Sequence, residues 1–329
     1  SHPHLVFAGE RSGEFEARVA GAPYDGGGIA STVAATRAAA TAALDAGAQR
    51  RRRAMWRRGS TTVEAKSGYA LDVGGEARLL DVSGRHAEAT TFLGAHVVPA
   101  EYAGDRDGYV SLVAGSMLDA CAPKAQWADV FCDRGAFSVD EARHVLIAAR
   151  AAGLGLRLHG HQIEATGAVA LAVELGAASV DHCTILSARD VDLLGQSSTV
   201  ATLLPGAELF AHAQRAPGRA LVDAGATVAL ATDCNPGTSF VTSMPLVIAL
   251  AVAHHGLSCD EALWSATRGG ALALRRDDVG ALGLGSRADL LVLDAPRAAH
   301  LASRPGADVG ASVHGADSSS AARDELADQ

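Results

Sequence analysis

Short runs of apolar residues alternate with longer Ala-rich segments along most of the chain. The short runs have the length of strands and are bounded by Gly, Pro and polar residues. The pattern predicts eight strands, at residues 4–9, 59–66, 90–98, 128–133, 155–161, 179–183, 197–205 and 226–233. The Ala-rich segments predict helices between them, including 31–47, 138–153, 166–177 and 216–225.

Eight strands that alternate with helices favour an α/β fold of the (β/α)8, or TIM-like, barrel type over a doubly wound sheet. The glycines in 26–31 lack the spacing of a dinucleotide-binding loop, and we interpret them as a loop before a helix. We expect the barrel to occupy residues 1–275. Residues 276–300 contain one more strand outside the barrel pattern, and 301–329, with little hydrophobic pattern, are predicted to form a mobile tail.

Composition narrows the possible partners. Of the 329 residues, 48% are hydrophobic and 4% aromatic, which predicts a core of small and branched side chains. The net charge of −9 argues against a nucleic-acid partner, and we interpret the basic run at 50–58 as a solvated helix face leading into the next strand. Five scattered cysteines indicate reduced thiols in a cytoplasm, and the absence of a long uncharged apolar run argues against a membrane partner.

Histidines and one aspartate gather at the ends of the predicted strands. In a barrel of this type the carboxyl ends of the strands form the active-site face. The residues at these ends are His2 and His4 on the first strand, His159 on the fifth, His182 on the sixth and Asp233 on the eighth. His2 and His4 share one side of their strand, because side chains alternate with a period of two.

Each of these residues taken alone has a simpler interpretation. A single histidine in an apolar strand is more often a hydrogen-bonded core residue, and Asp233 could form a turn before Asn235. Four imidazoles and one carboxylate at the same end of a barrel instead indicate a mononuclear metal site with a neighbouring acid/base histidine. His161 has the opposite parity to His159 and is predicted to be structural.

Several segments carry a resemblance to a known family. They are HPHLVFAGER, GAPYDGGGI, GSTTVEAKSGY, FLGAHVVP, DVFCDRGAFS, LHGHQI, LAVELGAASVDHC, ALATDCNPGTS and GLGSRADLLVLD. In this order they resemble the amidohydrolase superfamily and, within it, the imidazolonepropionase family. The resemblance implies a cytoplasmic enzyme of histidine degradation, in a family whose members tend to be homodimers. That enzyme would hydrolyse the cyclic amide C–N bond of 4-imidazolone-5-propanoate to N-formimino-L-glutamate.

The resemblance also implies roles for individual residues. It implies one Zn²⁺ or Fe ion per subunit, bound by His2, His4, His159 and Asp233. His182 would orient the attacking water, and Asp233 would also transfer its proton. Residues implied in substrate binding are Arg11, Tyr24, Tyr69, His96, Gln162, Asn235 and Gly237. The fourth strand lacks the lysine that bridges two metals in other members of the superfamily, which is why a single ion is expected.

Two departures from the family pattern leave alternatives open. Gln162 stands where many members have a carboxylate, so we expect it to bind substrate rather than to act as a base. Members of the family carry a segment before the first strand that pairs with residues after the barrel, so 276–300 is expected to be a remnant of that accessory β-sandwich with an unpaired edge. The alternatives are another cyclic-amide or nucleobase amidohydrolase, and an N-terminally truncated, inactive barrel that only binds metal.

Overall fold

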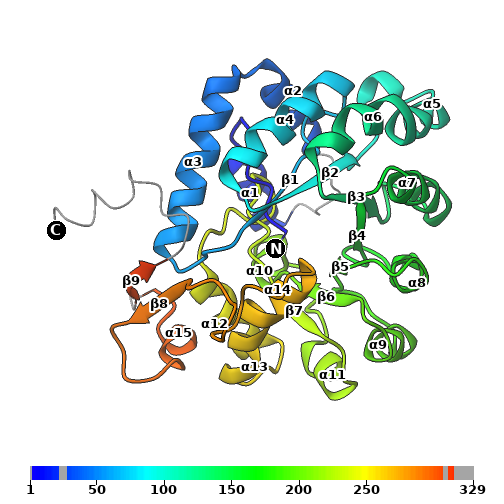
Figure 1. The fold of residues 1–329 in the computed structure, drawn as a ribbon. Helices are drawn as coiled ribbons and strands as arrows, with labels where there is room; N and C mark the ends of the chain where they lie inside the picture. Colours follow the sequence, from blue (N-terminus) through cyan, green and yellow to red (C-terminus); the bar gives the residue numbers. More distant parts are fainter. Residues whose placement is uncertain (1, 22–27, 307–309, 315–329) are drawn as a thin grey trace.

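Seven parallel strands form one curved sheet in sequential order from β1 to β7. This computed structural model describes residues 2–21, 28–306 and 310–314. The strands are β1 (Glu64–Lys66), β2 (Ala89–Ala95), β3 (Trp127–Cys132), β4 (Gly155–Gly160), β5 (Ser179–His182), β6 (Val200–Leu203) and β7 (Val228–Leu230). They match seven of the eight predicted barrel strands, and the sheet curls with its helices on the outside (Figure 1).

Helices follow the strands around the outside of the sheet. Between the N-terminal segment and β3 they are α1 (Ser12–Val19), α2 (Ile29–Ala38), α3 (Thr41–Arg57), α4 (Val73–His86), α5 (Arg106–Leu112) and α6 (Leu118–Cys121). Around the rest of the sheet they are α7 (Val139–Ala151), α8 (Ala168–Glu174), α9 (Ala188–Gly195), α10 (Pro205–Ala211), α11 (Gly218–Asp223), α12 (Met244–His254), α13 (Cys259–Trp264) and α14 (Gly270–Ala273). None of the helices that the structure describes is both long enough and apolar enough to span a bilayer.

The prediction of a strand at residues 4–9 is wrong, because the structure forms no regular strand there. The segment nevertheless lies between β1 and the chain after β7. Lys66 N donates to Pro3 O at 3.0 Å, and His4 N donates to Cys234 O at 3.0 Å. Pro3 has no N–H to continue a ladder, and the carbonyls of Leu5 and Phe7 accept hydrogen bonds from a side chain instead of a strand.

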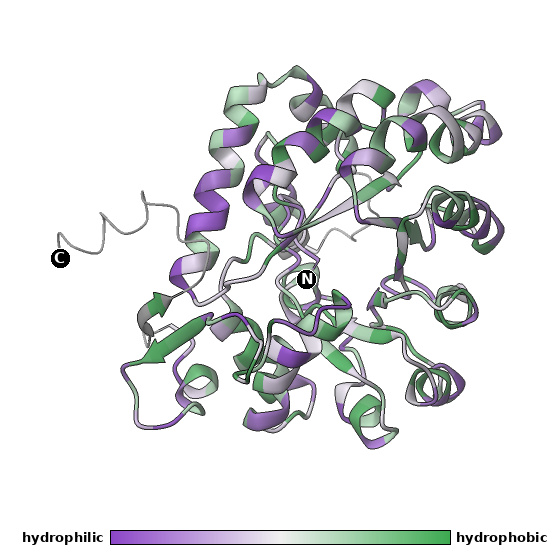
Figure 2. Ribbon diagram, viewed as in Figure 1, coloured by the Kyte–Doolittle hydropathy of each residue, from purple (hydrophilic) through white to green (hydrophobic). Residues whose placement is uncertain are grey.

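That side chain is Arg51 of α3. Its Nε donates to Leu5 O at 2.8 Å and its Nη2 to Phe7 O at 3.2 Å, while its guanidinium carbon lies 3.8 Å from the centroid of the Phe7 ring. The basic run does lie on a helix that leads toward β1, as predicted, and Figure 2 shows the hydrophilic stretch of α3. It is not simply a solvated face, because Arg51 supports the N-terminal segment.

The single helix predicted at 31–47 is divided into α2 and α3. Ala39 and Ala40 have extended backbone conformations, with φ/ψ of −72°/140° and −64°/145°. The guanidinium of Arg78 donates to Thr36 O at 3.0 Å and to Ala39 O at 3.1 Å. These bonds satisfy carbonyls that a continuous helix would have used, so the break is stabilised from α4.

The C-terminal part differs from the expected unpaired strand and tail. Strand β8 (Leu290–Leu293) pairs in antiparallel fashion with β9 (Gly310–His314), and the short helix α15 (His300–Ser303) lies between them in the chain. The edge of β8 therefore has a partner that the sequence pattern did not reveal. Residues 315–329 of the predicted tail lie outside the described residues, and the accessory-sandwich assignment stays a prediction.

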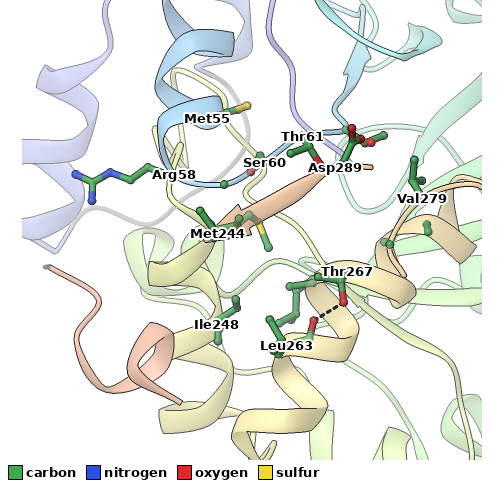
Figure 3. A pocket seen from close by; sticks show the side chains of 18 of the residues that line it. Met55, Arg58, Ser60, Thr61, Met244, Ile248, Leu263, Thr267, Val279 and Asp289 are labelled. Carbon is green, nitrogen blue, oxygen red and sulfur yellow. Dashed lines mark hydrogen bonds between the residues drawn. The ribbon is translucent and has the colours of Figure 1, made fainter. Parts of the chain in front are cut away.

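A cavity of about 490 Å³ separates this hairpin from the barrel. Its mainly apolar walls come from α3, the barrel helices and β8, including Met55, Ile248, Leu263 and Val279 (Figure 3). Leu291 packs closely on Gly59, where a Cβ atom would lie 2.6 Å from the leucine Cδ2. Gly59, with a φ of 86°, therefore permits both the turn before β1 and the approach of β8.

Candidate metal centre

The predicted histidines and aspartate meet at the carboxyl end of the sheet. His159 lies near the end of β4, His182 ends β5, Asp233 follows β7, and His2 and His4 lie on the N-terminal segment. All five side chains are buried. The parallel strands bring these residues together because their carboxyl ends open on one face of the barrel.

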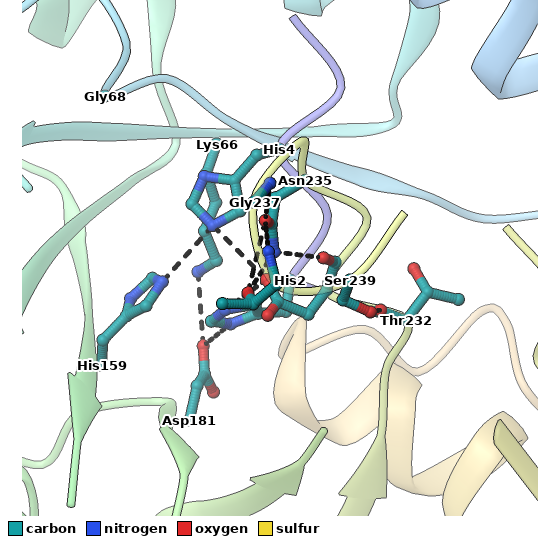
Figure 4. Close-up of polar contacts among 12 residues, drawn as sticks. His2, His4, Lys66, Gly68, His159, Asp181, Thr232, Asn235, Gly237 and Ser239 are labelled. Atoms are coloured by element: carbon teal, nitrogen blue, oxygen red, sulfur yellow. Dashed lines mark hydrogen bonds and ion pairs between the residues drawn. The ribbon is translucent and has the colours of Figure 1, made fainter. Parts of the chain in front are cut away.

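The separations between their polar atoms suit a metal ion. His4 Nε2 lies 3.4 Å from His159 Nε2 (Figure 4). Asp233 Oδ1 lies 3.5 Å from His2 Nε2 and 3.8 Å from His4 Nε2. A tetrahedral ion with bonds of about 2.1 Å would separate its ligand atoms by about 3.4 Å. Ligand atoms of His2, His4 and Asp233 all lie within 4.8 Å of one another, and His159 adjoins this group through His4, so three of the four candidate ligands are already gathered as one ion requires.

Unpaired polar atoms support the same interpretation. Within the described part of the chain, His2 Nε2 is buried and has no hydrogen-bond partner. Burying such an atom without a partner costs free energy, and a metal ion would satisfy it. The donor set of three imidazoles and one carboxylate is also one that Zn²⁺ and Fe²⁺ accept. The residues present therefore fit a metal ion of this kind.

His182 lies beside these four residues. Its ring centroid is 5.3 Å from that of His2 and 5.4 Å from that of His159. One of its ring nitrogens lies within 4.8 Å of ligand atoms of both His2 and His159, so distance alone would allow it to coordinate as well. It also lines the cavity next to the ligands, where it can reach a bound molecule.

Burial sets the protonation of the cluster. It lowers the pKa of His2 to about 3 and holds those of His4 and His182 well below their ordinary value, with neighbouring imidazoles adding to the shift. Burial raises the pKa of Asp233 to about 7. Neutral imidazoles keep the lone pairs that a cation needs, and a nearby cation would favour the ionised form of Asp233.

The backbone is strained at three of these residues. The φ angles of His2, His182 and Asp233 are 81°, 81° and 49°, in a region that side chains other than glycine rarely adopt. Such conformations cost about 1–3 kcal/mol each and persist where the surroundings enforce them. Their concentration around one cluster is typical of a functional site.

Comparisons with known proteins show the family of this chain. A family model described as "Amidohydrolase family" matches residues 128–315. Proteins named imidazolonepropionase from Streptomyces griseus and Streptomyces coelicolor are each 58% identical to this chain, over 93% and 95% of it and 78% and 80% of their own lengths. One from Mycolicibacterium smegmatis is 55% identical over 95% of this chain and 79% of its own. The chain belongs to the imidazolonepropionase family of amidohydrolases.

Solved structures at lower identity share its fold. Guanine deaminase from C. acetobutylicum superposes with a TM-score of 0.69 at 14% identity, covering 95% of this chain and 83% of that one. The atrazine chlorohydrolase TrzN from Arthrobacter aurescens TC1, solved in complex with zinc, gives 0.64 at 16% identity over 95% and 80% of the two chains. These matches confirm the predicted barrel class.

Most of the residues that the imidazolonepropionase family pattern assigns to substrate line a cavity next to the ligands. They are Arg11, Tyr69, His96, Gln162 and Asn235. His96 stacks on His4 with centroids 5.4 Å apart, and Gly68 O accepts a hydrogen bond from its Nδ1 at 2.9 Å. Tyr24 lies outside the described residues. The substrate roles of all these residues stay predictions.

Arg11 and Gly237 depend on each other. A Cβ atom at Gly237 would lie 2.4 Å from Arg11 Nη1, so only glycine leaves room for the guanidinium at this place. The guanidinium forms a fork with the Glu14 carboxylate, in which Arg11 Nε lies 2.9 Å from Glu14 Oε1. A bidentate contact of this kind is the geometry in which arginine recognises carboxylates.

Asn235 forms hydrogen bonds within its own loop in addition to lining the cavity. Its Nδ2 donates to Asp233 O at 2.7 Å, and its Oδ1 accepts from the backbone N–H groups of Gly237 and Thr238 at 2.8 Å each. These bonds shape the loop that carries Asp233. His161 is structural as predicted, because its Nδ1 donates to Ile185 O and its Nε2 accepts from Gly167 N.

Sequence reasoning missed two sets of polar residues around the site. Glu76 of α4 accepts from the backbone N–H groups of Gly68, Ala70 and Leu71 at 2.8 Å each and so holds the loop that carries Tyr69. The other set lies inside the barrel below the candidate ligands and consists of Glu64, Lys66, Asp129, Arg157 and Asp181. The sequence feature that could have identified them is the presence of charged residues at inward positions of otherwise apolar strands, which is unusual in a barrel interior.

Proposed function

We propose that this chain catalyses the hydrolysis of 4-imidazolone-5-propanoate to N-formimino-L-glutamate. The observation that carries the proposal is the buried group of His2, His4 and Asp233, with His159 Nε2 3.4 Å from His4 Nε2, in a chain 58% identical to proteins named imidazolonepropionase. In this reaction the oxygen of water bonds to the ring carbonyl carbon, the adjacent C–N bond breaks, and the ring nitrogen leaves with a proton.

One Zn²⁺ or Fe ion per subunit would be held by His2, His4, His159 and Asp233. When bound, such an ion supplies Lewis acidity, which lowers the pKa of water and polarises a carbonyl. We assign the proton transfers to the Asp233 carboxylate, which would accept the proton of the attacking water and pass it to the leaving ring nitrogen. His182, at the wall of the cavity, would hold the water in place and stabilise charge on the carbonyl oxygen.

The substrate would lie in the cavity beside the ligands. Its propionate carries the same carboxylate group that Glu14 presents to Arg11, which supports Arg11 as the residue that binds it. Tyr69 and His96, with ring centroids 5.3 Å apart, would pack on the ring and hydrogen-bond its polar atoms. Gln162 can hydrogen-bond the ring but cannot remove a proton from it.

All five cysteines of the chain are free, and four of them are buried. Free thiols are typical of a reducing compartment, which supports a cytoplasmic enzyme. The homodimer implied by the family resemblance stays a prediction.

Substrate tests and metal analysis examine this proposal together. The purified chain should contain close to one zinc or iron per subunit and should produce formiminoglutamate from the imidazolone. Turnover of guanine or cytosine in its place would instead identify a nucleobase amidohydrolase. Bound metal without turnover of any of the three compounds would identify an inactive metal-binding barrel.

A further inference from the structure

A buried charged cluster lies directly below the candidate ligands, on the inner side of the barrel. It comprises Lys66 and Glu64 of β1, Asp129 of β3, Arg157 of β4 and Asp181 of β5, each at most 1% exposed. Charged side chains are rarely this deeply buried unless they are paired. We call these five residues the barrel cluster.

Lys66 lies at the centre of the barrel cluster. Its Nζ is 2.6 Å from Asp129 Oδ2, 3.3 Å from Asp181 Oδ2 and 3.3 Å from Glu64 Oε1. Arg157 pairs with the same Glu64 oxygen at 3.3 Å. Two cations thus face three carboxylates, and each charge has the partner that deep burial demands.

The pairing favours the charged form of Lys66. Burial alone would lower the pKa of Lys66, but the carboxylates of Asp129, Glu64 and Asp181 outweigh it and raise the pKa above its ordinary value. One oxygen of each aspartate lies within 3.3 Å of this ammonium, so both carboxylates share one cation.

The two aspartates connect Lys66 to the ligands. The Asp181 oxygen near Lys66 lies 2.6 Å from His2 Nδ1, and the Asp129 oxygen near Lys66 lies 3.0 Å from His159 Nδ1. Figure 4 shows the contacts of Asp181 with both Lys66 and His2. A carboxylate beside a ring nitrogen favours the proton on that nitrogen, so each Nδ1 would carry the proton and the lone pair of each ring would stay on the Nε2 that faces the other ligands. Of the two contacts, the one to His2 has the geometry of a hydrogen bond.

We propose that Lys66 is a positioning residue for the metal centre. Its ammonium holds Asp129 and Asp181 against the Nδ1 atoms of His159 and His2, and thereby orients the Nε2 atoms of both ligands toward one ion. This inference rests on the proposed function only in requiring that the four ligands bind a metal; the identity of the substrate does not enter it.

Lys66 also occupies a position that could hold a second cation. Ligand atoms of Asp129, His159 and Asp181 all lie within 4.8 Å of one another, which is the geometry of a possible cation site. The ammonium already lies beside two of these three residues. Without it, two carboxylates would share a dry site with no positive charge between them, and their mutual repulsion would turn them away from the ligand rings.

The test uses the full chain stripped of metal and the variant Lys66→Met, which keeps the length of the side chain and removes its charge. The dissociation constant for Co²⁺ is measured by competition with a chelator, and the tautomers of uniformly ¹⁵N-labelled histidines by NMR. We expect Lys66→Met to weaken Co²⁺ binding by roughly 10- to 100-fold and to shift two histidines away from the Nδ1-protonated form. Wild-type affinity and tautomers in a folded Lys66→Met protein would overturn the proposal.

A control separates this role from the general loss of a cation paired with a carboxylate. Arg52→Met removes a cation that lies 2.9 Å from Glu88 and contacts none of the ligands, and it should leave Co²⁺ affinity and tautomers unchanged. If Lys66→Met does not fold, Asp129→Asn and Asp181→Asn take its place, each expected to weaken Co²⁺ binding and to alter one histidine. Unchanged binding in both asparagine variants would equally overturn the proposal.

The outcomes also separate this inference from the proposed function. Lys66-dependent metal binding in a chain that does not open the imidazolone ring would refute only the function. If the wild-type chain turns over the imidazolone but Lys66→Met binds Co²⁺ with wild-type affinity, only the role of Lys66 is refuted.

Discussion

His4 Nε2 and His159 Nε2 face each other at 3.4 Å although 155 residues separate them in the chain. Two neutral imidazoles that meet through these atoms present lone pairs to each other unless a proton or a cation lies between them. A metal ion would turn this repulsion into a bond that ties the N-terminal segment to β4. Metal binding and the position of this segment should therefore depend on each other.

Replacing His4 tests that dependence. His4→Ala removes one of four ligands and should lower metal affinity by more than roughly 100-fold, since even the loss of a group that only orients a ligand costs about 10- to 100-fold. Metal content measured by mass spectrometry and turnover of the imidazolone should fall together. Activity that survives in a metal-free His4→Ala protein would remove His4 from the ligand set.

Replacing Arg11 should separate substrate binding from metal binding. Arg11→Ala should keep its metal and raise KM by roughly 10- to 150-fold, the equivalent of about 1.5–3 kcal/mol for hydrogen bonds to a charged group. Arg11→Lys keeps the charge but loses the two-pronged guanidinium contact, so its KM should lie between those of the wild type and Arg11→Ala. If Arg11→Ala loses the metal instead, the assignment of Arg11 to the substrate is wrong.

Much of this site could be predicted because its signal is local. His2 and His4 share the parity of one extended segment, and His159, His182 and Asp233 end short apolar runs, so the barrel pattern alone brings them together. The same reasoning gave seven of the strands, because each is bounded by turn residues and buried on both faces.

The remaining features depend on contacts between distant segments. Nothing near Lys66 in the chain shows that Asp129 and Asp181 will surround it, since a charged residue in a short strand is usually read as solvent-exposed. Arg51 looked like part of a solvated basic run, because no local pattern shows that Leu5 and Phe7 lack strand partners. Strand β9 has a weak hydrophobic pattern, and it is recognised as a strand only because it pairs with β8.

The loop that carries Gln162 should depend on Asp133. The buried carboxylate of Asp133 accepts from the backbone N–H groups of Gln162 at 2.7 Å, Ile163 at 3.1 Å and Glu164 at 3.0 Å. Asp133→Asn replaces an acceptor with a donor and should remove about 1–2 kcal/mol of loop stabilisation. Steady-state kinetics should show KM raised by roughly 5- to 30-fold with metal content unchanged.

The control for this change is Asp140→Asn on the exposed first turn of α7. It removes the same charge without touching the loop and should leave KM unchanged. Equal KM values in the two variants would show that Asp133 does not act through Gln162.

The stability of the metal-free chain should fall as the pH is lowered below 6.5, in part through His96. Burial, together with the nearby His159, lowers the pKa of His96 from 6.5 to about 4. The unfolded chain therefore takes up a proton near pH 6.5 that the folded chain refuses until about pH 4, so the stability is fully present above 6.5 and is lost toward 4. His96→Gln should reduce the loss of unfolding free energy between pH 7 and pH 5 by about 2 kcal/mol.

Urea denaturation of the metal-free protein at both pH values measures this difference. His144→Gln serves as the matched control, because His144 is exposed on α7. The idea fails if His96→Gln and His144→Gln lose the same unfolding free energy between the two pH values.

Arg51 should hold the metal ligands indirectly, through the segment that carries them. Arg51→Met removes the donors to Leu5 O and Phe7 O, at a cost of roughly 1–3 kcal/mol, and should speed amide hydrogen exchange in that segment and weaken Co²⁺ binding. Arg53→Met, an exposed change on the same helix, should alter neither. If the two variants match, the bonds from Lys66 N and to Cys234 O suffice to hold the segment, and the guanidinium of Arg51 only packs against Phe7.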